Sequence, residues 1–474
     1  MTALLVGFIV YLVLMLTIGA ITWRLNRSTT DYYLGGRTLG PWLTAFSERT
    51  SGESAWLLLG LPGAALALGL IEVWTAVGCV SGIMFSWYVI AERLRVETER
   101  YNAITLPEYL AARFGRHARS IRSLAMLIIV FFFTFYLAAQ MNGAGKVLNV
   151  TFDLPQRSGI LIGAAIIVLY TMMGGFLAVV WTDLVQAILM IATLVILPVV
   201  ALFELSAQGI SLGDAMTNAG TVASLTGGKA GWAGAAAVIG GLSWGLGYMG
   251  QPHLLTKFMA IRTPQEIRVG RRIAFAWAVP AFTGAIIIGL AALALHGGAF
   301  YGDRERVMPA LATELFPGWL AGILISGAIA AMMSTADSQL LVISSAVIED
   351  FYRKTLKREL SDRAMVTLSR LITLTVGIAG ILLALYSDKL IFAMVSYAWS
   401  GLGSSFGPAI LLTLLWKKTS GPGIIAGMLT GAITTVVWSS IPALDGLITA
   451  RLVSFVLAVA AIIVVSSGRD EKAL

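Results

Sequence analysis

Charge is scarce in this sequence. Asp, Glu, Lys and Arg make up only 12% of its 474 residues, whereas hydrophobic residues make up 58% and the mean hydropathy is +0.84. A soluble domain of this length needs far more charge on its surface, so this composition excludes one. Apolar runs long enough to cross about 30 Å of hydrocarbon recur along nearly the whole chain. We therefore predict an all-α polytopic membrane protein in contact with a lipid bilayer.

Cysteine, histidine and catalytic motifs are equally sparse. Cys79 is the only cysteine, which excludes a disulfide framework and a thiolate metal site. The three histidines are scattered, and neither an H-E-x-x-H nor a G-x-S-x-G motif occurs. Gly228-Lys229 lacks the flanking residues of a phosphate loop, and no loop is long enough for an ATPase domain. We expect no enzyme activity and no organic cofactor, so the energy source is an ion gradient or the protein is passive.

The apolar runs divide into thirteen expected spans. They lie near residues 3–22, 41–68, 71–92, 123–145, 158–178, 180–204, 234–256, 273–298, 318–348, 364–386, 390–416, 421–441 and 445–467. Of the 33 Lys and Arg residues, 24, with Lys257 among them, fall in loops assigned to the cytoplasm and 7 on the other side. This bias predicts an N-terminus outside and a C-terminus inside. It also explains the net charge of +8 without a nucleic-acid partner.

Two stretches within these spans are unsuited to contact with lipid. Residues 47–63 read SERTSGESAWLLLGLPG and carry Glu48, Arg49 and Glu53, and residues 241–253 read GLSWGLGYMGQPH. Charged groups and loosened backbone are costly where water cannot satisfy them, so both stretches are predicted to be interrupted helices lining a polar cavity. Each opens a block of five spans, which is typical of a transporter built from an inverted repeat.

Oxygen-bearing side chains concentrate in the ninth span, which reads AMMSTADSQ over residues 331–339. Ser334, Thr335 and Ser338 place hydroxyls on one side of the helix, and Asp337 adds a carboxylate. Such hydroxyls often bond the preceding turn or join helices. Small hard cations, however, prefer several oxygen ligands, including carbonyls freed by a broken helix, so a cation site is the favoured hypothesis.

Two further features have competing interpretations. Asp183 lies at the expected start of the sixth span, where it would be a helix-start residue with Thr182 as cap, or else a ligand of the ninth span. Trp244 and Tyr248 are spaced i, i+4 on the second interrupted helix. Such a pair usually packs, but beside unwound backbone it is suited to covering a small solute.

The sequence resembles the sodium:solute symporter family, and within it the sodium/proline symporters. The matching motifs, in family order, are YYLGGRTLGP (32–41), SAWLLLGLPGA (54–64), GGFLAVVWTD-x-x-Q (174–186), WGLGYMGQPH (244–253), MSTADSQLL (333–341) and SYAWSGLGSSFGP (396–408). The resemblance implies about 13 transmembrane helices and a leucine-transporter-type 5+5 inverted repeat with two interrupted helices. The corresponding divisions are a leading segment (1–40), the first repeat (41–205), an outside loop (206–233), the second repeat (234–418) and two accessory helices (419–474).

The resemblance also implies site residues, carried over by position. The main sodium site would use the carbonyls of Thr50, Glu53 and Ala331 and the hydroxyls of Ser334 and Thr335. A second cation site, present in some members, would use Asp183, Ser334, Asp337 and Ser338. The solute face would comprise Ser54, Trp244, Tyr248 and Pro252. Proline-transporting members carry an aspartate where this chain has Gly52, and Glu48 and Arg49 replace small residues.

The implied function is sodium-coupled uptake of a small solute by alternating access across a bacterial inner membrane. L-proline is the favoured solute. One alternative keeps the mechanism and changes the cargo to pantothenate, a monocarboxylate or another amino acid. Another replaces sodium by a proton taken up through Glu53. A third is a sensor or channel-like protein on the same fold.

Overall fold

The computed structural model describes residues 2–23, 29–172, 175–218, 223–297, 302–359 and 361–468. Within these ranges the regular elements are all helices, and one isolated bridge pairs Leu39 with Ile261. Four basic residues that enter the predicted charge bias lie outside the described residues: Arg24, Arg27, Arg469 and Lys472.

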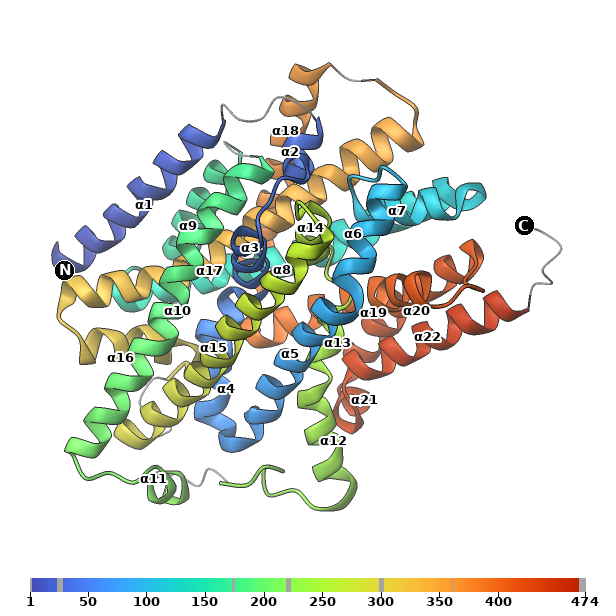
Figure 1. The fold of residues 1–474 in the computed structure, drawn as a ribbon. Helices are drawn as coiled ribbons and strands as arrows, with labels where there is room; N and C mark the ends of the chain where they lie inside the picture. Colours follow the sequence, from blue (N-terminus) through green and yellow to red (C-terminus); the bar gives the residue numbers. More distant parts are fainter. Residues whose placement is uncertain are drawn as a thin grey trace.

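The helices follow one another from end to end of the chain (Figure 1). In the first half they are α1 (Thr2–Trp23), α2 (Thr29–Leu34), α3 (Pro41–Ala55), α4 (Leu61–Leu68), α5 (Val73–Phe85), α6 (Ala91–Arg100), α7 (Leu106–Arg113), α8 (Ala118–Phe152), α9 (Gln156–Thr171) and α10 (Phe176–Ala207). Then come α11 (Leu212–Asn218), α12 (Gly231–Leu242), α13 (Trp244–Tyr248), α14 (Pro252–Ala260), α15 (Ile267–His296), α16 (Val307–Leu315), α17 (Gly318–Ser345), α18 (Asp362–Tyr386), α19 (Ile391–Leu415), α20 (Gly421–Ser439), α21 (Pro442–Leu447) and α22 (Ala450–Ser467).

Nine helical stretches in the described part of the chain are long and apolar enough to cross a membrane, and two shorter apolar helices accompany them. One of the nine, Pro41–Arg100, contains two of the expected spans. It reverses after α4 at Gly69, whose φ of +74° is a conformation that glycine adopts without strain. The class of multi-pass membrane protein is thus confirmed, while the count of thirteen spans stays a prediction.

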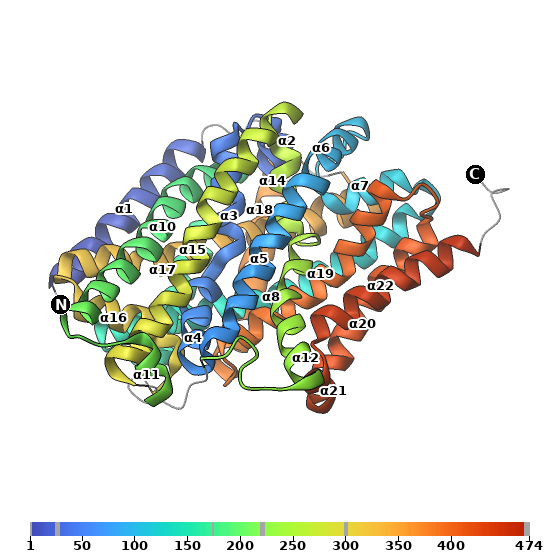
Figure 2. The same ribbon diagram turned by 60° about the horizontal axis from the view of Figure 1, so that its bottom comes forward.

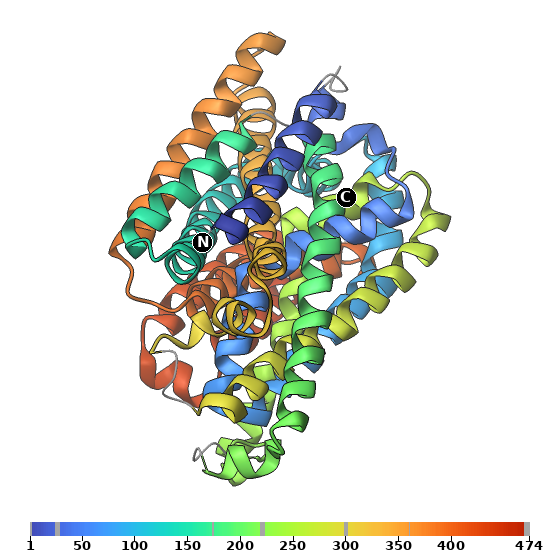
Figure 3. The ribbon, with the colours of Figure 1, turned by 90° about the vertical axis from the view of Figure 1, so that its left-hand side faces the viewer.

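The centre of the bundle is occupied by α3, which packs against α10, α15 and α17. From Ala321 onward α17 is buried along nearly its whole length. Figure 3 shows α1 in dark blue on the side that carries the N-terminus, beside the long green α10. At the opposite edge α20 and α22 lie side by side against α19 (Figure 2). The polar residues of α3 are therefore screened from lipid by a complete layer of other helices.

Both predicted interruptions are present. In α3 the backbone leaves helical geometry at Ser54, with φ 35° and ψ −167°, and a π-helical segment over 56–60 leads into α4. The Ala55 N–H freed by this break donates to Gln140 Oε1 of α8 at 3.0 Å. The second interruption separates α13 from α14, and Gln251 within it donates to the Trp399 carbonyl at 3.1 Å. A neighbouring side chain thus accepts the N–H freed at the first break, and at the second break the Gln251 side chain joins the interrupted segment to α19.

Glycines allow helices around the breaks to touch through their backbones. A Cβ added at Gly82 of α5 would lie 2.2 Å from the Gly245 carbonyl oxygen of α13. A Cβ at Gly250 would lie 2.3 Å from the Gly407 backbone nitrogen of α19. Small residues at such crossings are how membrane helices approach closely without a hydrophobic driving force.

We predict that Gly82→Ala lowers the free energy of unfolding by about 1–3 kcal/mol, because the added methyl group must push two backbones apart. Gly240→Ala in α12 is the matched control, since a Cβ there meets nothing within 4 Å. The apparent melting temperature of the purified protein in detergent measures both. Equal melting temperatures for the two variants would contradict the close packing of α5 and α13.

Candidate functional site

The end of α3 meets the middle of α17 through oxygen atoms. Ser334 Oγ lies 3.2 Å from the Thr50 carbonyl oxygen and 3.0 Å from that of Ala331. Thr335 Oγ1 lies 3.1 Å from the Ser51 carbonyl oxygen and 3.4 Å from that of Thr50. All of these side chains are buried. Two hydroxyls and three carbonyls therefore converge, which is the donor set that a small hard cation prefers.

Four of the five predicted sodium ligands belong to this group of oxygens, and the Glu53 carbonyl does not. The carbonyl of Glu53 accepts the backbone N–H of Trp56, so it is already used in the turn after the break. The Glu53 side chain points to a different set of partners, described below.

Asp183 does not lie at a helix start. The helix α10 begins at Phe176 rather than near residue 180, so Asp183 is about two turns inside it and fully buried. Thr182 is not a cap either, because its hydroxyl donates to the Ala178 and Val179 carbonyls of the preceding turn. The helix-start interpretation is wrong, since α10 begins at Phe176 and its first two turns carry Asp183 into the bundle.

Within the bundle, Asp183 is the meeting point of three helices. Its Oδ2 accepts from Ser47 Oγ at 2.5 Å and from Ser51 Oγ at 3.4 Å, both on α3. The same oxygen lies 3.4 Å from Lys257 Nζ of α14. Ser51 Oγ is also 2.8 Å from Ser338 Oγ of α17. Among the described residues, Asp183 Oδ1 has no hydrogen-bond partner.

Asp337 is the other predicted ligand of the second cation site. Its Oδ1 accepts a hydrogen bond from Thr171 Oγ1 of α9, and its Oδ2 is buried with no partner in the described part of the chain. Ser334 bonds toward α3 instead, as described above. Of the four predicted ligands, the hydrogen bonds thus connect Asp183 and Ser338 through Ser51, and leave Asp337 attached to α9.

A buried charge cluster fills the space beside the α3 break. Arg49 pairs with both Glu48 and Glu53, the Glu53 contact being 2.7 Å. Tyr248 Oη donates to both Glu53 oxygens at 3.0 and 3.1 Å, and its ring faces the Arg49 guanidinium at 5.4 Å. Trp87 Nε1 donates to Glu48 at 3.0 Å. One buried guanidinium therefore serves two buried carboxylates at the same time.

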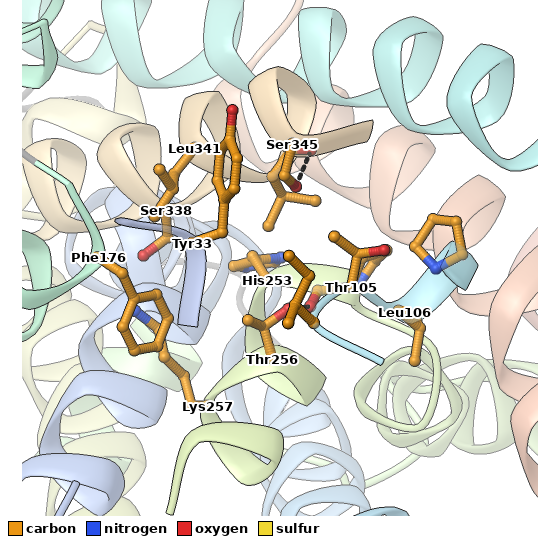
Figure 4. A pocket seen from close by; sticks show the side chains of 14 residues that line it. Tyr33, Thr105, Leu106, Phe176, His253, Thr256, Lys257, Ser338, Leu341 and Ser345 are labelled. Carbon is orange, nitrogen blue, oxygen red and sulfur yellow. Dashed lines mark hydrogen bonds between the residues drawn. The ribbon is translucent and has the colours of Figure 1, made fainter. Parts of the chain in front are cut away.

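The predicted solute residues lie in two places. Ser54, Trp244 and Tyr248 surround the α3 break: Tyr136 Oη donates to Ser54 Oγ at 3.4 Å, and Trp244 stacks on Trp56 with ring centroids 4.8 Å apart. Pro252, in contrast, begins α14 and lines a narrow pocket with His253, Lys257 and Ser338 (Figure 4).

Two cavities flank this central region. A cavity of about 350 Å³ on the α12 side is lined by Glu72, Trp244, Phe392 and Arg451. The pocket in Figure 4, on the side of α2 and α7, encloses only about 10 Å³. That volume is roughly what one water molecule needs. The stacked Trp56–Trp244 pair, itself buried, separates the larger cavity from the α3 break.

Comparison with known proteins decides the family. The profile of the sodium:solute symporter family matches residues 32–431. The chain belongs to the sodium:solute symporter family. This symporter is 40% identical over 448 residues to the sodium/proline symporter of Escherichia coli (strain K12), covering 92% of this chain and 88% of that one. It is 39% identical over 429 residues to the high-affinity proline transporter of Bacillus subtilis (strain 168), covering 90% of each chain.

Solved structures support the fold of the symporter. It superposes on a Na+-coupled sialic acid symporter with a TM-score of 0.80 at 18% identity, covering 99% of this chain and 98% of the other. A second match, the nucleobase-cation-symport-1 family transporter Mhp1, has a TM-score of 0.54 at 15% identity and covers 93% and 96%. The predicted leucine-transporter-type fold with interrupted helices is confirmed.

Several site residues of the symporter escaped the sequence interpretation. Lys257, counted with a cytoplasmic loop, is buried inside α14, because that helix continues to Ala260 beyond the expected end of the span. His253 Nε2 lies 3.1 Å from the Ser51 carbonyl oxygen, and Gln140 supports the α3 break. Gln140 could have been found from the sequence as a polar side chain within a long apolar run. Lys257 could have been found because no helix-breaking residue follows Pro252 before Ala260, so the helix continues past it.

We predict that Arg49→Met lowers the free energy of unfolding of the symporter by about 3–5 kcal/mol, because two buried carboxylates lose their only guanidinium. The triple variant Glu48→Gln/Arg49→Met/Glu53→Gln recovers most of this loss, since no charge is then left unpaired. Arg262→Met, which removes an exposed pair with Glu266, is the control and leaves the apparent melting temperature nearly unchanged. A triple variant no more stable than Arg49→Met would contradict the charge argument.

Proposed function

We propose that this symporter uses inward sodium movement to take up L-proline by alternating access. The observation that carries the proposal is the convergence of Ser334 and Thr335 hydroxyls on the Thr50 and Ser51 carbonyls at the α3 break. Proline is proposed as the cargo because curated relatives at about 40% identity are sodium/proline symporters. The membrane potential supplies about 2.3 kcal/mol per charge per 100 mV, in addition to the sodium concentration ratio.

Sodium is proposed to bind between α3 and α17. Its ligands would be the carbonyls of Thr50, Glu53 and Ala331 and the hydroxyls of Ser334 and Thr335. The two hydroxyls now donate to α3 carbonyls, and they can rotate to present lone pairs to a cation. A bound ion would hold the broken end of α3 against α17. Because that same end carries the proposed solute residue Ser54, ion and solute would raise each other's affinity by an equal factor.

The solute is proposed to bind beside the break, against Ser54, Trp244 and Tyr248, with Pro252 on the exit side. Proline is a zwitterion, and the Arg49–Glu53–Tyr248 group offers opposite charges within one site. Glu53 would thereby take over the part played in proline-transporting members by the aspartate at the position of Gly52. The larger cavity lined by Trp244 is the proposed entrance and the narrow pocket lined by Pro252 the proposed exit.

The orientation and division of the chain belong to the same proposal. The basic residues favour an N-terminus outside and a C-terminus in the cytoplasm of a bacterium, across its inner membrane. The two repeats are proposed to span residues 41–205 and 234–418. In support, each contains one interrupted helix near its start, α3–α4 in the first and α12–α14 in the second.

A second candidate is proton coupling, which the buried Glu53 carboxylate favours. Counterflow in proteoliposomes separates the candidates: labelled proline, pantothenate, a monocarboxylate and other amino acids are offered with and without sodium at fixed pH. We expect proline to exchange only with sodium present. Exchange that is independent of sodium but depends on pH would favour proton coupling over sodium coupling. Binding of a solute without its accumulation would indicate a sensor.

We predict that Ser334→Ala/Thr335→Ala abolishes sodium-dependent uptake, because two of the proposed ligands lose their oxygens, while the protein still reaches the membrane. Ser326→Ala in the same helix is the matched control, since its hydroxyl only bonds the Gly322 carbonyl of its own helix. Uptake rates over a range of sodium concentrations, normalised to membrane protein, give the measurement. Unchanged uptake in the double variant would refute the site.

A further inference from the structure

The Lys257 side chain brings an ammonium group close to the proposed ion-binding region. Its ammonium lies 3.4 Å from Asp183 Oδ2 and 4.8 Å from the centre of the Phe176 ring. Both partners in the ion pair are buried, with side-chain exposures of 1% and 0%. Figure 4 shows Lys257 reaching from α14 alongside Phe176 on the side of the pocket where Ser338 lies. A lysine in this setting is held by a carboxylate and an aromatic face rather than by water.

One oxygen of Asp183 is already in use, whereas its Oδ1 has no partner among the described residues. Its Oδ2 already accepts two serine hydroxyls and the ammonium, so one oxygen collects three donors. A sodium ion placed there would face the ammonium at short range, and in a site with little water that repulsion is poorly screened. The hydroxyls at the Thr50 carbonyl lack such a fixed cation as a partner, because their bonds run to backbone oxygens.

We propose that the Lys257 ammonium is a tethered cation that occupies the place of a second sodium ion at Asp183, so that one sodium ion accompanies each solute. The inference rests on the proposed function, because it fixes the ion stoichiometry of that transport. The charge on Asp183 is balanced by a group that stays with the protein throughout the cycle. Only the ion at the Ser334–Thr335 site then crosses the membrane with the solute.

The contacts around Asp183 join three helices. Ser47 and Ser51 belong to α3, Asp183 to α10 and Lys257 to α14, so the ion pair joins both interrupted helices to a third. A free second ion would be able to make this connection only while bound. The tethered ammonium makes it in every state in which α14 stays beside α10.

The test measures how many sodium ions bind and move. Purified protein in proteoliposomes is given radioactive sodium and labelled proline, and the ratio of the two fluxes is measured, together with the Hill slope for sodium. Equilibrium binding of radioactive sodium to the detergent-purified protein counts sites even where a variant no longer transports. The variants are Lys257→Met, Lys257→Arg and the charge-neutral double variant Asp183→Asn/Lys257→Met.

We expect one bound sodium ion and a flux ratio of one for the wild type and for Lys257→Arg, which keeps the cation. Lys257→Met exposes the Asp183 carboxylate and gains a second bound ion, and the double variant returns to one. Two sodium ions in the wild type, or one in a folded Lys257→Met protein, would overturn the inference. A wild type that transports without sodium would instead refute the proposed function, so the two failures are distinguishable.

Discussion

The absence of water in the hydrocarbon core is the constraint on which this structure depends, because a helix cannot break there unless the protein supplies the missing hydrogen bonds. At the first break the Gln140 side chain of α8 accepts the freed Ala55 N–H, and near the second break Trp399 Nε1 of α19 donates to the Trp244 carbonyl of α13. Each break is thus stabilised by a helix from outside its own segment. The carbonyls of Thr50 and Ser51 accept hydroxyls of α17. The oxygens left near the break can therefore also serve as ligands of an ion.

The same constraint governs the buried charges. In the described residues around the breaks, carboxylates outnumber fixed cations by two; the groups are Glu48, Arg49, Glu53, Asp183, Lys257 and Asp337. A buried carboxylate without a counterion is strongly unfavourable, so this region is suited to receiving mobile positive charge. Arg49 and Lys257 do not remove that surplus, but they decide where it remains. Lys257 pairs with Asp183, and Arg49 is shared between two glutamates at the α3 break. The second surplus carboxylate is Asp337, which accepts from Thr171 of α9.

Much of this arrangement was predictable from the sequence, and the failures have a common cause. Residues 47–63 and 331–339 concentrate polar groups that lipid would not tolerate, so their burial and their role at the breaks followed from local chemistry. The Arg49 pair with Glu53 was also foreseeable, since the two residues are four positions apart along one helix. Lys257 was assigned to a loop, and Asp183 was left between a helix start and a ligand of the ninth span, because each depends on a partner 74 positions away in the chain. No local pattern encodes a pair brought together by tertiary packing, here by α3, which contacts both α10 and α14.

The contact of α4 with α15 and the contact of α3 with α17 differ in kind, and alternating access depends on which contacts can separate. A Cβ at Gly289 of α15 would lie 2.2 Å from the Pro62 carbonyl oxygen of α4, and Gly82 of α5 meets α13 equally closely. Backbones in such contact fit in one arrangement only, because packed interiors resist small displacements. The contact between α3 and α17 is made by hydroxyls and carbonyls instead, and these exchange readily among protein, ion and water partners. Ion occupancy thus acts on an interface that is joined by exchangeable polar contacts, which is where a few kcal/mol of binding energy can shift the balance between two states.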